Sequence, residues 1–357
     1  MAYVTVKGGR EAIEASIEKV RYEQFKGGVI LKAEEVKSSM KSLVDQVMSE
    51  ASLYDEDLAA LSICQGEGSP EECVFLLRAY RSTLPRKHYS LEIKSEEMRI
   101  HRRISASFKD IPGGQLLGAS RDYTHRLLDE EYFDKEAIRQ VVEKWDELEM
   151  HEESELQFPK VLDYLRAQKM MVEYPVSEEE PDDVTKVSLT FPSSRSQRLQ
   201  VLTRGQTGAV TALGYASLRG FGSVHPTVGE LRVGRLPVSI ANPMDEKDED
   251  DGYSIGDIEV TEVESIIPTF IEREDKSREM RFEIGYGICF GQNESKAIAM
   301  SILDNCLEHP SEVPTHQEEF VLLHIDSVEA TGFISHLKLP HYVTFQAELD
   351  GVRKESK

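Results

Sequence analysis

The sequence predicts an α+β fold, with a mainly helical N-terminal part and a mixed α/β C-terminal part. Residues 8–25 and 32–52 carry apolar residues at three- and four-residue spacing, which is typical of amphipathic helices. Beyond residue 183 the chain changes to short runs rich in β-forming residues and punctuated by glycine, at 229–240, 255–271 and 280–290. We therefore expect helices before this change and a sheet with further helices after it.

Other helices are marked by their ends. Residues 69–85 begin with a serine cap, a proline at the first helical position and acids in the first turn. Residues 135–150, 159–171 and 293–309 show the same periodicity, and the last begins with Asn293 as cap.

The boundary between the two parts is predicted at an acidic stretch that contains two prolines. The expected organisation is a mainly helical domain at 1–172, an acidic linker at 173–183 and a mixed α+β domain at 184–357.

Composition indicates a soluble globular protein. The 357 residues are 39% hydrophobic and 30% charged. A formal net charge of −23 argues against nucleic acid or an anionic membrane as the main partner. The four cysteines form no CxxC pair, and no stretch reads as a signal core or a membrane span. We expect a cytoplasmic protein with free thiols.

A segment of opposite charge lies within this acidic chain. Between Val184 and Met244, here called the basic segment, six arginines and one lysine face a single acid, Glu230. Ser193 and Ser194 precede Arg195 at the expected start of a helix, so hydroxyls, free amides and a guanidinium could converge on a phosphate. The alternative is that these arginines pair across the surface with the acidic loops, which are the stretch at 173–183 and a second one at 245–252.

A second cluster of polar residues lies at 102–129. Arg102, Arg103 and Lys109 lead to Asp110 and to a Pro-Gly-Gly turn whose backbone could approach a ligand closely. Arg121, Asp122, Tyr123, His125 and Arg126 follow. The alternative is a tight turn that needs glycine only for its positive φ angles.

Near the C-terminus His336 and His341 flank Lys338 and Pro340. Five-residue spacing does not suit one face of a helix, and Pro340 disfavours helix at Leu339, so we expect an extended or turned segment. Such a segment can direct two imidazoles at one metal ion, for which zinc is the natural choice. The other ligands would be water, a substrate phosphate, His324 or a residue of another chain. The alternative is a pair of ordinary packing histidines.

Several stretches resemble one known family. They include "FLLRAYRSTL", "RRISASFKDIPGGQLLG", "DYTHRLLD", "SRSQRL", "GYGICFG" and "EEFVLLHIDSVEATGFISHLKLPHYVTFQAEL". In this order they resemble the PhnI subunit family of bacterial carbon–phosphorus lyase over most of the chain. The resemblance fades around residues 130–172 and 242–280.

The resemblance implies a function in the use of phosphonates as a phosphorus source. The implied reaction is displacement of adenine from ATP by an alkylphosphonate, which gives a ribose 1-alkylphosphonate 5-triphosphate, with purine nucleosidase activity when the subunit is alone. The implied partners are the other core subunits, including a radical S-adenosylmethionine subunit, around a central homodimer. The resemblance also implies that His336 and His341 bind zinc at the contact with the radical subunit.

This chemistry assigns expected roles to residues. Breaking an N-glycosidic bond builds positive charge on the ribose and requires a proton for the departing base. The candidates for this acid are Asp110, Asp122, His125 and Glu230. Mg²⁺ would accompany the triphosphate. The expected substrate-binding residues are Arg103, Lys109, Gly113, Gly114, Ser194, Arg195, Arg198, Arg232 and Lys338. A zinc-bearing scaffold without catalysis and a stand-alone nucleosidase are the competing hypotheses.

Overall fold

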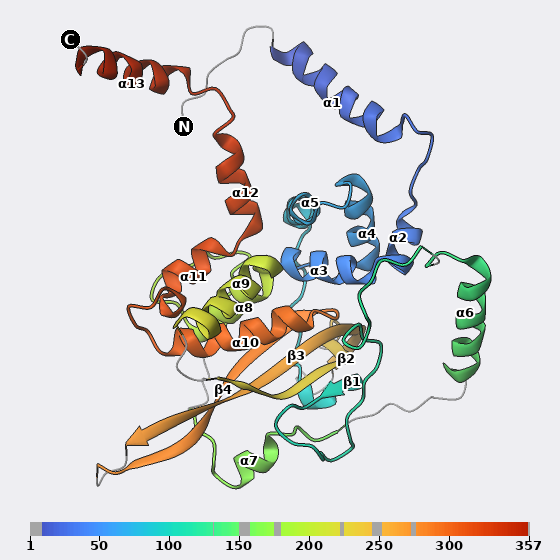
Figure 1. The fold of residues 1–357 in the computed structure, drawn as a ribbon, viewed down its shortest axis with the longest axis vertical. Helices are drawn as coiled ribbons and strands as arrows, with labels where there is room; N and C mark the ends of the chain where they lie inside the picture. Colours follow the sequence, from blue (N-terminus) through green and yellow to red (C-terminus); the bar gives the residue numbers. More distant parts are fainter. Residues whose placement is uncertain are drawn as a thin grey trace. The chain divides into compact units, whose positions relative to one another are not determined.

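The computed structural model describes residues 9–130, 132–149, 158–174, 180–221, 225–244, 252–272 and 276–355 (Figure 1). The predicted α+β class is confirmed. The chain forms two compact units, one of Met1–Thr83 with His324–Lys357 and one of Leu84–Leu323. The predicted linker at 173–183 therefore falls within the second unit, because a strand before it pairs with a strand after it. Residues 175–179 of that linker lie outside the described residues.

The first unit is helical. Its helices are α1 Gly9–Phe25, α2 Ala33–Ser39, α3 Lys41–Ala51, α4 Glu56–Gln65, α5 Pro70–Thr83, α12 Ser327–His336 and α13 Tyr342–Glu355. The predicted helix at 32–52 is two helices, because Met40 at φ −117° and ψ 36° interrupts it. Val44, Val47, Met48 and Ala51 of α3 follow the three- and four-residue spacing and form part of the core between α2, α4 and α5.

The second unit is built on a four-stranded antiparallel sheet of order β1-β2-β3-β4. Its strands are β1 Arg99–Ile104, β2 Thr227–Ala241, β3 Gly252–Glu272 and β4 Arg278–Phe290. Its helices are α6 Lys135–Glu149, α7 Asp163–Ala167, α8 Arg195–Arg204, α9 Thr207–Ala216, α10 Glu294–Glu308 and α11 Glu318–His324. The predicted helix at 159–171 is thus reduced to the short α7.

One face of the sheet is covered by α10, which packs on β3 and β4 (Figure 1). The close approach requires glycine, since a β-carbon at Gly285 or Gly287 of β4 would collide with the backbone of α10. The glycines of "GYGICFG" therefore serve helix packing on a strand. Leu162, Leu165 and Met171 pack with Ile266 of β3 on the opposite face. No described helix has the length and apolar character that a bilayer span requires.

Candidate functional site

Two of the predicted arginines, Arg103 and Arg232, lie in a buried group of charges on the sheet face opposite α10. The register places Arg103 of β1, Arg232 of β2 and Glu262 of β3 in one row. The sheet-face cluster, as we name it, consists of Arg103, Lys160, Glu230, Arg232, Glu262, Glu264 and Tyr286.

Arg103 is fully buried and paired with Glu230. Its Nε donates to Glu230 Oε1 at 2.6 Å, its Nη2 donates to the carbonyl of Pro159 at 2.8 Å, and its guanidinium lies 5.0 Å from the Phe158 ring centroid. The second oxygen of Glu230 accepts from the Val161 amide at 2.9 Å. The predicted acid and the predicted phosphate ligand therefore neutralise each other and fasten the chain around residues 158–161 to the sheet.

Glu262 is the centre of the same cluster. It accepts hydrogen bonds from Arg232 Nε at 3.0 Å, Tyr286 Oη at 2.9 Å and Lys160 Nζ at 3.2 Å. Burial alone would raise the pKa of Glu262, but the charges of Arg232 and Lys160 and the hydrogen bonds outweigh burial and lower it. Burial and the neighbouring carboxylate raise the pKa of Tyr286, so its hydroxyl stays protonated and donates.

Sequence reasoning missed Glu262 and Glu264. The signal for them was present, because acids two positions apart within an apolar strand occupy one face and need buried partners. Glu230 and Arg232 on β2 have the same spacing.

The predicted phosphate site at the start of α8 is filled by internal carboxylates. Ser193 donates from its amide to Glu318 Oε2 at 3.0 Å, and its hydroxyl donates to the same oxygen. Ser194 caps the helix, its Oγ accepting from the Gln197 amide at 3.2 Å.

The arginines of this helix are engaged in the same way. Arg195 forms a forked pair with the buried Asp304, at 3.1 Å from Nε to Oδ1 and 2.6 Å from Nη2 to Oδ2. Arg198 pairs with Glu308 and donates to the Ser193 carbonyl at 2.9 Å. The pairing alternative holds here, although the partners lie on α10 rather than in the acidic loops. The predicted role of Ser194, Arg195, Arg198 and Arg232 in phosphate binding stays a prediction, and the internal carboxylate partners of the three arginines favour the alternative.

Residues 109–128, called the 109–128 loop, present the other candidates differently. Lys109, Asp110 and His125 are exposed, and so are Arg121 and Arg126. Among the described residues none of these five side chains has a hydrogen-bonded or salt-bridged partner. The loop therefore offers three cations and an imidazole to a ligand.

The glycine turn at the start of this loop has two distinct positions. Gly113 and Gly114 have φ angles of +83° and +76°. A β-carbon at Gly113 would collide with the Phe158 ring, whereas nothing lies within 4 Å of one at Gly114. Gly113 is thus required for packing and Gly114 only for its backbone conformation.

Among the predicted acids, Asp122 alone is both exposed and hydrogen-bonded to a buried arginine. Its side chain is 54% exposed, and its Oδ2 accepts from Arg102 Nη2 at 2.6 Å. A hydrogen bond from Ser120 and the charge of Arg102 lower the pKa of Asp122 below its ordinary value. Asp122 is therefore ionised at neutral pH and suits stabilisation of positive charge better than donation of a proton.

The histidine pair lies at the turn between α12 and α13. His336 ends α12, the chain is not helical at Leu339, as Pro340 predicts, and the imidazole centroids lie 5.3 Å apart. Nδ1 of His341 donates to the Leu339 carbonyl at 2.6 Å, and Nδ1 of His336 donates to the Phe333 carbonyl. These bonds fix the tautomer that leaves both Nε2 atoms available as ligands. Lys338 in the same turn is exposed.

The described residues hold no group of three or more histidine, cysteine, aspartate or glutamate side chains arranged for a metal ion. The pair therefore supplies two ligands, and a complete site would need others.

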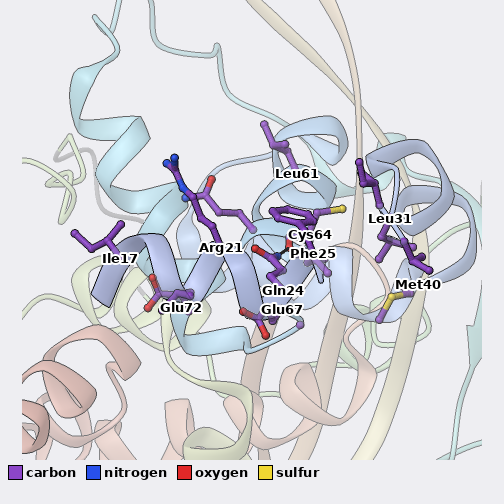
Figure 2. A pocket seen from close by; sticks show the side chains of 16 residues that line it. Ile17, Arg21, Gln24, Phe25, Leu31, Met40, Leu61, Cys64, Glu67 and Glu72 are labelled. Carbon is purple, nitrogen blue, oxygen red and sulfur yellow. Dashed lines mark hydrogen bonds between the residues drawn. The ribbon is translucent and has the colours of Figure 1, made fainter. Parts of the chain in front are cut away.

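An apolar groove of about 940 Å³ lies in the first unit. Figure 2 shows it between α1, which contributes Ile17 and Phe25, and α4, which contributes Leu61. Gln24 closes one side by donating to the carbonyl of Cys64 at 3.0 Å. No predicted site residue is among those that line it.

Comparison with known proteins gives one consistent result. The sequence profile of the family described as "Bacterial phosphonate metabolism protein (PhnI)" matches residues 2–357. A protein of Rhizobium meliloti (strain 1021) named alpha-D-ribose 1-methylphosphonate 5-triphosphate synthase subunit PhnI is 41% identical over 99% of this chain and 94% of its own length. A protein of the same name from Escherichia coli (strain K12) is 40% identical over 99% of this chain and 98% of its own length.

Proposed function

This chain belongs to the PhnI family of bacterial phosphonate metabolism proteins, and on that premise we propose that it is a subunit of an alpha-D-ribose 1-methylphosphonate 5-triphosphate synthase. The observation that carries the proposal is its identity of 40% and 41%, over 99% of the chain, to two proteins of that name. It acts in the cytoplasm with the other core subunits of carbon–phosphorus lyase, including the radical S-adenosylmethionine subunit, around a central homodimer.

The proposed reaction exchanges one substituent of the ribose. An oxygen of the alkylphosphonate forms a bond to C1′ of ATP, the bond from C1′ to adenine N9 breaks, and adenine leaves with a proton. Water in place of the phosphonate would give the purine nucleosidase activity proposed for the chain alone. The transition state carries positive charge on the ribose beside a triphosphate, which Mg²⁺ partly neutralises when bound.

The 109–128 loop supplies the groups that this reaction needs. Lys109, Arg121 and Arg126 bind the anionic groups, since none of them has a hydrogen-bonded or salt-bridged carboxylate partner among the described residues. The charge of Arg126 also helps to lower the pKa of Asp122. Gly114 lets the backbone approach the ligand, because it has no side chain and no atom of the chain lies within 4 Å of the position that a β-carbon would occupy.

Different residues of this loop serve as the proton donor and as the group that stabilises positive charge. Asp122, ionised because its pKa is lowered, faces the developing positive charge of the ribose. His125 donates the proton to adenine, because its imidazole is exposed and has no hydrogen-bonded partner among the described residues. Asp110, also exposed, is the remaining candidate for this donor.

We propose further that His336 and His341 bind zinc through their Nε2 atoms. The support is the pair of Nδ1 hydrogen bonds to backbone carbonyls, which orient both rings. When bound, the metal would join this turn to the subunit that provides the other ligands, and Lys338 lies beside that contact. Replacing both histidines by alanine should remove zinc from the purified complex without changing the unfolding temperature of this chain. Undiminished zinc in the double variant would refute the assignment.

The function is tested by incubating the chain and its companion subunits with Mg²⁺-ATP and methylphosphonate. Chromatography should show released adenine, and ³¹P spectroscopy should show a phosphonate ester at the ribose. His125→Gln should lower kcat about 100-fold or more, whereas the exposed control Arg278→Gln on β4 should react like the wild type. No adenine from any combination that contains the wild-type chain would eliminate the proposal.

A further inference from the structure

A buried guanidinium connects the 109–128 loop to β1 and α10 of the second unit. Arg102 of β1 is 2% exposed. Its Nε donates to Glu294 Oε1 at 2.7 Å and its Nη2 donates to Glu294 Oε2 at 3.0 Å. The same Nη2 donates to Asp122 at 2.6 Å, and Nη1 donates to the Leu117 carbonyl. One side chain thus joins β1, the first turn of α10 and two points of the loop.

The backbone on the N-terminal side of Asp122 is fixed by further contacts. Leu116 pairs with Arg103 by two hydrogen bonds of 2.8 Å between their amides and carbonyls. Gln292, just before α10, donates to the Ala119 carbonyl at 3.0 Å and to Glu294 Oε1 at 2.8 Å. Gly118 has a φ of +55°, and a β-carbon there would meet the carbonyl of His101. The chain from 116 to 119 therefore follows the sheet edge closely before the exposed residues begin.

The burial of Arg102 and the way its donors are shared explain how the position of Asp122 is set. Glu294 is 21% exposed at the side chain and Asp122 is 54% exposed, while the guanidinium between them is buried. Glu294 occupies two of the donors of Arg102 and so fixes the plane of the guanidinium. The remaining donors then determine where the carboxylate of Asp122 can lie.

We propose that Arg102, oriented by Glu294, is a positioning residue that sets the carboxylate of Asp122 for the ribose, an inference that rests on the function proposed above. Arg102 itself lies beneath the loop and does not contact the substrate. Glu294 acts one contact further away. A lysine at position 102 keeps the charge but cannot form the fork, so the proposal requires the geometry and not the charge alone.

The test compares Glu294→Gln, Arg102→Lys and Asp122→Asn in the assembled complex with Mg²⁺-ATP and methylphosphonate. Glu294→Gln and Arg102→Lys should each lower kcat about 10-fold to 100-fold with an unchanged KM for ATP, because misplacement of a catalytic group affects mainly the transition state. The double variant Glu294→Gln with Asp122→Asn should be no slower than Asp122→Asn alone.

A structural readout accompanies the kinetics. Amide hydrogen exchange at residues 116–122 should accelerate in Arg102→Lys and not in Arg99→Gln. This control also lies on β1, and it removes an ion pair with Asp257 of β3. A variant that lost activity only by unfolding would accelerate exchange throughout the unit, which would overturn the positioning role.

The two levels of the proposal fail differently. A wild-type complex that releases no adenine, or a fully active Asp122→Asn, removes the function assigned to Asp122 and the inference with it. Losses that multiply in the double variant of an otherwise normal complex overturn only the positioning by Arg102 and Glu294.

Discussion

The basic segment and the 109–128 loop both looked like anion sites in the sequence, and the structure places several of their cations in opposite surroundings. Arg195, Arg198 and Arg232 each pair with a carboxylate. Lys109, Arg121 and Arg126 have no such partner among the described residues. The difference teaches that a local excess of positive charge in the sequence need not form a positively charged site in the fold. Carboxylates 30 to 110 positions away pair with these arginines.

The largest expected effect is on stability, at the buried pairs. Arg103→Ala leaves the buried Glu230 without its ion-pair partner, so it should lower the free energy of unfolding by about 3–5 kcal/mol. Arg232→Ala leaves Glu262 with Lys160 as its remaining cation, so the loss should be smaller. Denaturant unfolding measures this, with Arg121→Ala as a matched loop variant of unchanged midpoint. Normal stability combined with lost nucleotide affinity in the Arg232 variant would return that residue to the binding site.

The glycine turn offers a matched pair of smaller effects. Gly113→Ala should destabilise by about 3 kcal/mol, because it adds a collision with Phe158 to the cost of a positive φ. Gly114→Ala should cost only about 1 kcal/mol, since its surroundings are open. Thermal unfolding of both variants measures the two losses of stability. Equal losses would contradict the packing role of Gly113.

A pH dependence sharpens the contrast further. The lowered pKa of Glu262 means that its ionised form stabilises the fold above its ordinary pKa of 4.5, and this stability is lost as the pH falls through the lower folded value. The free energy of unfolding should therefore decline below about pH 4.5. Glu262→Gln should decline less over the same range. Parallel curves for the two proteins would show that Glu262 does not contribute.

Local structure was largely readable from the sequence. Caps and periodicity predicted α5, α8 and α10, and the β-rich runs predicted β2, β3 and β4 close to their observed bounds. The break at Met40 was not predicted. The helix α4 was not predicted either, because its apolar residues between Leu58 and Ile63 lie on several sides of the helix and give little amphipathic contrast. The fold class could be inferred because most helices and strands are determined by residues within one short stretch of the sequence.

The candidate site was only partly predictable. Asp122, His125 and the histidine pair were named from motifs, but the partners Glu294, Glu262, Asp304 and Glu318 were not. These carboxylates lie on other elements, and only the strand register and the packing of α10 bring them to the arginines. A sequence shows which residues carry charge, whereas their neutralisation depends on tertiary contacts.

The most direct measurement of the central claim is the affinity of the assembled complex for Mg²⁺-ATP, by calorimetry at two salt concentrations. The combined variant Lys109→Gln, Arg121→Gln and Arg126→Gln should bind about 10-fold or more weakly at low salt and lose most of the salt dependence. A folded variant with Arg195→Gln and Arg198→Gln should bind like the wild type. Unchanged affinity in the first variant with a loss in the second would contradict the account and place the nucleotide at the start of α8.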